Sequence, residues 1–130
     1  MKKPAIVAER WFRTPLYGVW IAVIIFNDFD KAVEIFCKKQ KLVPPVTSIT
    51  PHALHFWYEC GPFVIFFPSN NTTHADIGHE SFHATHRILA DRGDVFLVSN
   101  QEPYAYVMSW VTEQVYLTFY VAKKKVLLKK

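Results

Sequence analysis

The sequence predicts a single α+β domain in which one layer of β-sheet is packed against helices. An apolar, β-branched run from Leu16 to Phe26 has the composition of a strand covered on both faces. Two shorter runs rich in aromatic and β-branched residues, Ala53–Glu59 and Phe63–Phe67, flank a brief turn. Stretches with helical spacing separate and follow these strands. The predicted order is therefore strand, helix, hairpin, helix, helix.

The size and composition of the chain are those of one packed globular domain. Its 130 residues can bury a single core, and a hydrophobic fraction of 51% excludes a disordered chain. The net charge is +4, but five of the fifteen basic residues stand in the last eight positions. We interpret this tail as a solvated helix end and expect no nucleic-acid partner. We also expect no membrane partner, because the longest apolar run is too short to span a bilayer.

Cysteine usage predicts a cytoplasmic protein. Cys37 and Cys60 form no C-x-x-C pattern, which is typical of free thiols in a reducing compartment. No apolar run with a small-residue cleavage site follows the N-terminal lysines, so we expect no secretory signal. We interpret residues 1–130 as one domain, with residues 1–15 and 123–130 as loosely attached termini.

The first part of the chain is expected to form an arm, a strand and a surface helix. Residues 1–15 show no clear period and end at a proline, which predicts an irregular arm before the strand. Asn27 and Asp28 then offer a helix N-cap. In Phe29–Gln40 the apolar residues share one stripe and the charged residues lie outside it, which predicts an amphipathic helix.

The middle of the chain predicts a hairpin and a capped helix. Gly61 and Pro62 lie in a short loop between the two aromatic runs, and residues alternate between two faces in the first of them. Turn-forming residues then precede a helix that we expect from Thr72 to Gly93. The glycine is a natural C-terminal stop for this helix.

A second long helix is predicted near the C-terminus. Residues 94–101 are expected to form a connector or a short strand, and Pro103 suits an early position of the helix that follows. We expect this helix to run to about Val121. Its apolar residues supply the candidates for burial, which are Ala105, Met108, Val111, Val115, Leu117 and Phe119.

The first of these two helices carries an H-E-x-x-H pentapeptide, His79–His83 (HESFH). Residues four apart lie on the same face of a helix, so His79 and His83 can bind one metal ion. Glu80 projects about 100° round the axis from His79, which lets it reach an activated water without ligating the metal. Two histidine ligands beside a general base are the parts of a zinc hydrolase.

A catalytic zinc needs a third protein ligand. His86 lies seven residues beyond His79, about 10.5 Å along the helix axis, so its convergence with His83 on one metal is strained. We interpret His86 as a surface residue or as a residue that supports a metal ligand without binding the metal itself. Glu102, at the start of the next helix, can face the histidine pair if the two helices pack side by side. Glu113, three turns further along the same helix, would face the histidine pair if the two helices crossed differently, and it remains the alternative third ligand.

A further donor near the metal would help to stabilise an oxyanion. Tyr106 stands four residues after Glu102 on the same helical face, where its hydroxyl can orient a ligand or contact the reacting group. The competing interpretation is a packed tyrosine with an ordinary hydrogen bond. His52, His55 and His74 are other possible donors, but their positions in the sequence give no reason to prefer any of them.

Two segments of the chain together resemble the minimal gluzincin metallopeptidases, and especially versions carried by bacteriophages and their bacterial hosts. The pentapeptide His79–His83 matches the pattern H-E-S-x-H, and Glu102–Tyr106 (EPYAY) matches E-x-[FY]-A-Y. The resemblance covers about residues 53–121. It implies a zincin-like fold, with a small, mostly antiparallel sheet packed against the H-E-x-x-H helix and a following glutamate-bearing helix.

The resemblance also implies a site and an activity. One zinc ion per chain would be bound by His79, His83 and Glu102, with Glu80 as the general base of a peptidase. A sheet edge beside the active helix, expected to be Phe63–Phe67, would pair with an extended peptide or protein substrate. The chain has no counterpart of the second lobe of larger gluzincins, which supplies their substrate pockets.

The alternative is a degenerate zincin that binds zinc and a protein or peptide partner without cleaving it. The presence of Glu80 favours the enzyme, because structural zinc needs no general base. A closed structural site also needs four protein ligands, usually including cysteine, and Cys37 and Cys60 lie outside the motif.

Overall fold

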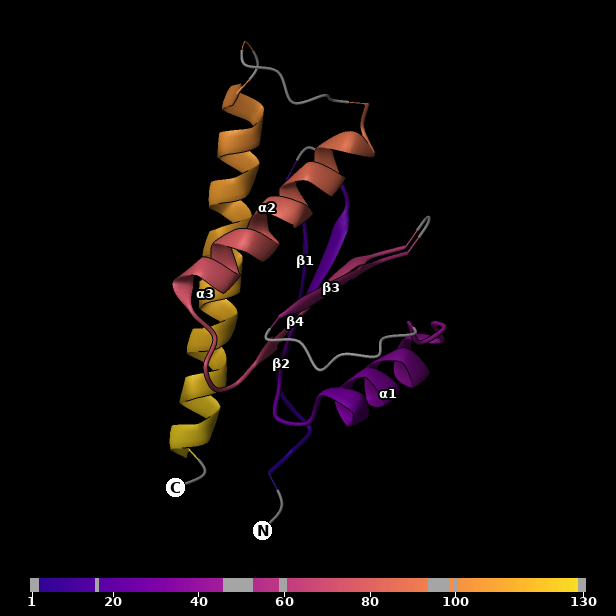
Figure 1. Ribbon diagram of the computed structural model, residues 1–130, viewed down its shortest axis with the longest axis vertical. Helices are drawn as coiled ribbons and strands as arrows, with labels where there is room; N and C mark the ends of the chain where they lie inside the picture. The colour runs from indigo at the N-terminus through magenta and orange to yellow at the C-terminus, as the bar shows by residue number, and fades with distance from the viewer. Residues whose placement is uncertain are drawn as a thin grey trace.

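The part of the chain that the structure describes forms a four-stranded sheet and three helices, as Figure 1 shows for the computed structural model. The structure describes residues 3–15, 17–45, 53–58, 61–93, 99 and 101–128, and from residue 125 onward the backbone alone. The predicted α+β class is confirmed. The elements are β1 (Ile6–Arg13), β2 (Trp20–Phe26), α1 (Phe29–Gln40), β3 (Leu54–Trp57), β4 (Phe63–Pro68), α2 (His74–Ala90) and α3 (Gln101–Leu128).

The sheet is mixed and has the strand order β1-β2-β4-β3. The pairs β1–β2 and β3–β4 are antiparallel, whereas the central pair β2–β4 is parallel. The parallel pair is possible because α1 and the chain after it separate β2 from the hairpin in sequence, which leaves enough residues for a crossover. Most strand pairs are antiparallel, as expected, but the central pair, β2–β4, is parallel.

The expectation of an irregular N-terminal arm over residues 1–15 is wrong, because most of them form β1. This strand pairs with β2 along its length, from Ile6 opposite Phe26 to Arg13 opposite Trp20. Ala8 and Phe12 enter one core, while Trp11 stacks on Phe36 of α1 on the other side of the sheet. With apolar residues on both sides, the strand lacks the clean alternation that reveals a half-buried strand in sequence.

The predicted hairpin is confirmed, but its two strands exchange the expected roles. Residues of β3 and β4 pair antiparallel from Leu54 opposite Phe66 to Trp57 opposite Phe63. The prediction that Phe63–Phe67 is the sheet edge is wrong, because β4 also pairs with β2 and is almost wholly buried. Of the two hairpin strands, β3 is the one that lies at an edge of the sheet.

The helices begin near the predicted positions because their caps are local. Asp28 accepts a hydrogen bond from the Lys31 amide at the start of α1. Thr73 and Asp76 form a capping box at the start of α2. Gly93, with φ of 81°, follows the end of α2. The connector predicted over residues 94–101 lies largely outside the described residues, and α3 continues through Leu128, beyond its expected end.

Helices cover both faces of the sheet, so the domain has three layers (Figure 1). α1 covers one face, and α2 and α3 together cover the other. α3 packs against β1 and β2, while α2 lies alongside α3 and reaches β3. Within the described parts of the chain, none of the helices combines the length and the hydropathy that a membrane span needs.

Tyr58, at the end of β3, connects this strand with α1. Its hydroxyl donates to the Val43 carbonyl oxygen at 3.2 Å and lies 3.7 Å from the Cys37 sulfur. Burial, and then the contact with Cys37, raise the pKa of Tyr58 above its usual value. Because the folded-state pKa is the higher one, the stabilisation of the folded state is complete at pH values below the unfolded-state pKa of about 10. This stabilisation is lost as the pH rises above that value.

We therefore expect Tyr58 to contribute to alkaline unfolding. In urea titrations between pH 8 and about pH 12, wild type should lose stability above pH 10 more steeply than Tyr58→Phe, which has no hydroxyl to ionise. Tyr106→Phe is the matched control, because Tyr106 is 58% exposed. Identical pH profiles for wild type and Tyr58→Phe would contradict this assignment.

Candidate functional site

The pentapeptide lies on the middle turns of α2. Ile77, Ala84 and Ile88 pack into the core under this helix, which sets its rotation against the sheet. As a result His79 is exposed and His83 is half-buried. Both therefore lie outside the core packing.

The two histidines point their ring nitrogens at each other. Nε2 of His79 and Nε2 of His83 are 3.1 Å apart, and the rings meet edge to face with centroids 4.7 Å apart. Two ligands at about 2.0–2.1 Å from a tetrahedral zinc are themselves about 3.3 Å apart. The donor set of this pair thus fits two adjacent positions on one zinc ion.

Glu80 lies beside the pair but in a different environment. Its side chain is almost fully buried, and the residue as a whole is 4% exposed. Nδ1 of His55, on β3, lies 2.7 Å from Glu80 Oε2. An ionised carboxylate can only accept, so His55 Nδ1–H is the donor. The hydrogen bond compensates for the burial of the carboxylate and fixes its orientation.

His55 contacts this group of residues, and sequence reasoning did not select it. Its ring stacks on Phe63 and lies 4.5 Å, centroid to centroid, from the ring of His83. The alternation along β3 placed His55 on the same face as Trp57, but the sequence does not say which helix covers that face. The proximity of His55 to the pentapeptide therefore becomes clear only once α2 is known to lie beside β3.

A second contact fixes β3 against α2. The guanidinium carbon of Arg87 lies 3.1 Å from the centre of the Trp57 ring, and Arg87 Nε lies 3.6 Å from an oxygen of Asp91. His55 and Trp57 are two residues apart on β3, while Glu80 and Arg87 are two turns apart on α2. The strand and the helix are thus joined at two points, and the His55–Glu80 contact is one of them.

The electrostatic environment favours a neutral His83. Burial lowers the pKa of His83, and the nearby positive charges of His55, His79 and His86 lower it further, whereas the charge of Glu80 acts in the opposite direction. The neutral imidazole is the form that binds metal ions. The surroundings of His83 therefore favour its neutral form.

An open hollow adjoins the pair. It has a volume of about 340 Å³ and is lined by Ala53, Ala75, Asp76, His79 and Glu80. It lies between the start of β3 and the N-terminal half of α2. This space borders both His79 and Glu80, so small molecules such as water can approach this part of α2.

The structure does not bring Glu102 to this group. The buried stripe of α3 includes Tyr104, and Glu102 stands two residues earlier, about 200° round the helix. Glu102, Tyr106 and Glu113 are accordingly exposed. Among the residues that the structure describes, no three His, Cys, Asp or Glu side chains are grouped closely enough to hold a metal. The ligand role of Glu102 and the donor role of Tyr106 stay predictions.

The remaining histidines lie elsewhere or outside the described residues. The His86 ring stacks on Phe82 and lies 6.5 Å from the Tyr104 ring, on an exposed part of α2. His74 hydrogen-bonds to the Tyr116 hydroxyl and so joins the start of α2 to α3. His52 falls in the undescribed segment before β3.

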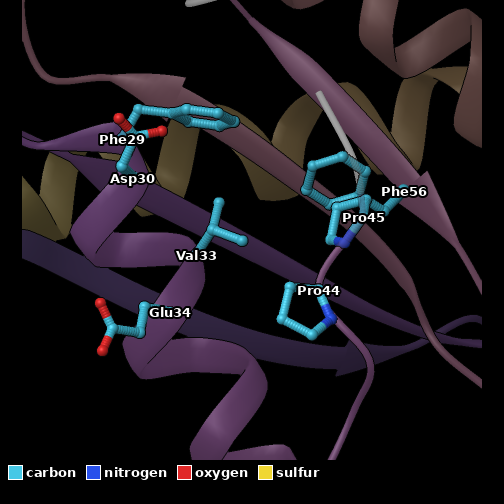
Figure 2. A pocket seen from close by; sticks show the side chains of 7 residues that line it. All are labelled: Phe29, Asp30, Val33, Glu34, Pro44, Pro45 and Phe56. Carbon is cyan, nitrogen blue, oxygen red and sulfur yellow. The ribbon is translucent and has the colours of Figure 1, made fainter. Parts of the chain in front are cut away.

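A second hollow, of about 210 Å³, lies by α1 and the residues that follow it. Figure 2 shows Phe29, Val33 and Glu34 of α1 on one side and Pro45 and Phe56 on the other. None of the described residues that line it is a histidine or a cysteine. These residues give the hollow a small apolar surface with acidic neighbours.

The chain matches no protein-family model, no curated protein and no solved structure. Inferences about its function therefore rest on the geometry of His55, His79, Glu80 and His83. This geometry combines two converging imidazole nitrogens, a buried carboxylate held by a hydrogen bond, and an adjoining open space.

Proposed function

We propose that the chain is a zinc-dependent peptidase. In this proposal His79 and His83 bind the metal ion, one per chain, and Glu80 is the general base. The observation that carries the proposal is the 3.1 Å separation of the two Nε2 atoms, next to a carboxylate that is buried and oriented. A separation of 3.1 Å also fits an N–H···N hydrogen bond between the two rings, so it is the buried, oriented carboxylate beside the pair that favours a metal site over a plain histidine pair.

Zinc held by His79 and His83 would supply Lewis acidity and would lower the pKa of a water molecule in the site towards neutrality. Glu80 accepts a proton from the attacking water and then delivers it to the leaving amine. His55 keeps the Glu80 carboxylate in one orientation through Nδ1–H. The low exposure of Glu80 limits competition from bulk water for its proton.

The proposed substrate is a peptide in an extended conformation. β3 pairs with β4 on one side and is the last strand of the described sheet on the other. An unpaired strand edge offers backbone donors and acceptors to an added strand. Because β3 carries His55, a peptide paired with this edge lies close to Glu80. The corrected edge strand therefore takes the substrate role expected of Phe63–Phe67.

The third ligand is a separate part of the proposal, and we assign it to Glu102. Its carboxylate is exposed at the first turn of α3, so ligation requires the start of α3 to stand nearer the pair than it does here. Zinc affinities of Glu102→Ala and Glu113→Ala distinguish the two glutamates. If neither substitution weakens binding, the third ligand lies elsewhere.

The second candidate is a degenerate zincin that binds zinc and a protein or peptide without cleaving it. Glu80 joins α2 to β3 through His55, which is a structural role that needs no proton transfer, and this contact is the observation that favours the candidate. Both candidates share the histidine pair, and they differ in whether Glu80 performs proton transfer. In either case we propose a reducing, cytoplasmic setting, which agrees with the buried free thiol of Cys37.

Metal content measured by mass spectrometry tests both candidates. After dialysis against buffer containing zinc, wild type should hold about one zinc ion per chain, and His83→Ala should lose at least about 100-fold in affinity, because one of its ligands is gone. His86→Ala is the matched control, since it removes a histidine from the same helix outside the pair. A wild type that takes up no zinc would overturn both candidates.

A further inference from the structure

α3 has two faces with different properties. Its inner face buries Tyr104, Val107, Val111 and Val115 against the rest of the domain. Its opposite face, along the C-terminal half of the helix, exposes Glu113, Leu117, Tyr120 and Lys124. We call these four residues the outer seam.

The outer seam has the spacing of a helix–helix contact. Its members are separated by four, three and four residues, which keeps them on one side of the helix. The two central members are large and well exposed, with Tyr120 at 61% and Leu117 at 41%. Figure 1 shows the C-terminal part of α3, in yellow, at the margin of the molecule beyond α2. The seam thus presents apolar area on an accessible side.

The order of the four residues is self-complementary. Leu117 and Tyr120 are centred between residues 118 and 119, and Glu113 and Lys124 are centred on the same point. A twofold axis through this point places Leu117 of each copy against Tyr120 of the other. The same operation places each Glu113 against Lys124 of the other copy. An isologous contact needs one patch to match itself in this way.

We propose that the outer seam is the interface of a homodimer in which two α3 helices pack antiparallel. The central leucine and tyrosine side chains bury apolar area, and an ion pair closes each end. In the single chain, Lys124 Nζ lies 6.0 Å from the Tyr120 ring, so the lysine already lies beside the aromatic residue that the contact buries. The mixed charge of the seam favours a second copy over an anionic or apolar surface.

This inference does not depend on the proposed zinc chemistry. The seam lies on the outer face of α3, whereas the zinc proposal rests on the histidine pair of α2, on β3 and on Glu102 at the start of α3. Glu113 belongs to both only as the alternative third ligand. Few side chains take part on each copy, so the interface is small and the dimer should be a weak one, with dissociation in the micromolar range or above. A weak dimer of this kind is measured by sedimentation velocity over a range of protein concentrations.

Charge reversal tests the register. Wild type should show a concentration-dependent monomer–dimer equilibrium. In a dimer of Glu113→Lys, the new lysine of each copy faces Lys124 of the other copy, and in a dimer of Lys124→Glu the new glutamate of each copy faces Glu113 of the other. Each reversal should therefore weaken self-association by about tenfold or more, at low salt, because two attractive pairs become repulsive. Both positions are exposed, and circular dichroism checks that each variant keeps its helices.

Mixing the two variants gives the decisive measurement. In a heterodimer of Glu113→Lys with Lys124→Glu, both ends of the contact again pair opposite charges. The mixture should therefore associate about as strongly as wild type, although each variant alone does not. Glu34→Lys, on α1, is the control and should associate like wild type. A wild type that stays monomeric up to about 1 mM, or a mixture that does not recover association, would overturn the proposed interface.

Discussion

Glu80→Gln is expected to abolish peptide hydrolysis while leaving zinc binding unchanged. The amide has nearly the same shape as the carboxylate, and its oxygen can still accept from His55 Nδ1–H. It cannot take a proton from water. General-base catalysis contributes about 10²- to 10⁴-fold, so the rate should fall by that factor. Cleavage of unstructured proteins and fluorogenic peptides, followed by mass spectrometry, measures the loss.

This variant also separates the two candidate functions. A peptidase loses turnover in Glu80→Gln and keeps about one zinc ion per chain. A degenerate zincin shows no cleavage in wild type, and Glu80→Gln then changes neither zinc content nor partner binding. Glu34→Gln is the matched control, because it makes the same substitution at an exposed position on α1. Full hydrolysis by Glu80→Gln would remove Glu80 from the mechanism.

Phe66→Ala is expected to cause the largest loss of stability. Phe66 is fully buried in β4, and its ring contacts the rings of Phe26, Phe29, Phe36 and Phe56. Removing the ring leaves a cavity in the core between the sheet and α1. Such substitutions cost about 3–5 kcal/mol, a large part of the about 5–15 kcal/mol that stabilises a typical domain.

Urea unfolding followed by circular dichroism measures this loss. Tyr106→Ala is the control, because an exposed aromatic side chain on α3 should contribute within about 0.5 kcal/mol. A loss below about 1 kcal/mol for Phe66→Ala would mean that the core under α1 collapses around the missing ring. The zinc content of the folded variant should stay unchanged, because the histidine pair lies on the other face of the sheet.

The local features of the fold were predictable from the sequence because each depends on residues close together in the chain. The helix α1 has the predicted bounds, and Asp28 caps it as expected. The hairpin of β3 and β4 follows from two β-rich runs around a short loop. The proximity of His79 and His83 follows from helical periodicity alone, since residues four apart share a face.

The missed features of the sheet depend on pairing between distant segments. β1 escaped prediction because it packs on both sides, as Ala8 and Trp11 show, and so lacks a clear alternation. The parallel pairing of β2 with β4 makes β4 an internal strand and leaves β3 as the edge. A strand's own composition does not specify its neighbours, because a fully buried apolar run can pair on either side.

The sequence by itself determined the class of the fold, the capped helix and the histidine pair, all through short-range spacing. Only the tertiary structure decided that His55 contacts Glu80 and that Glu102 faces solvent. The exposure of Glu102 could not be predicted because apolar residues occur all round α3, so the sequence does not show which face of this helix is buried. Tyr104 is buried while Leu117 and Tyr120 are exposed, so packing against the sheet and α2 selects the buried face and directs the glutamates outward.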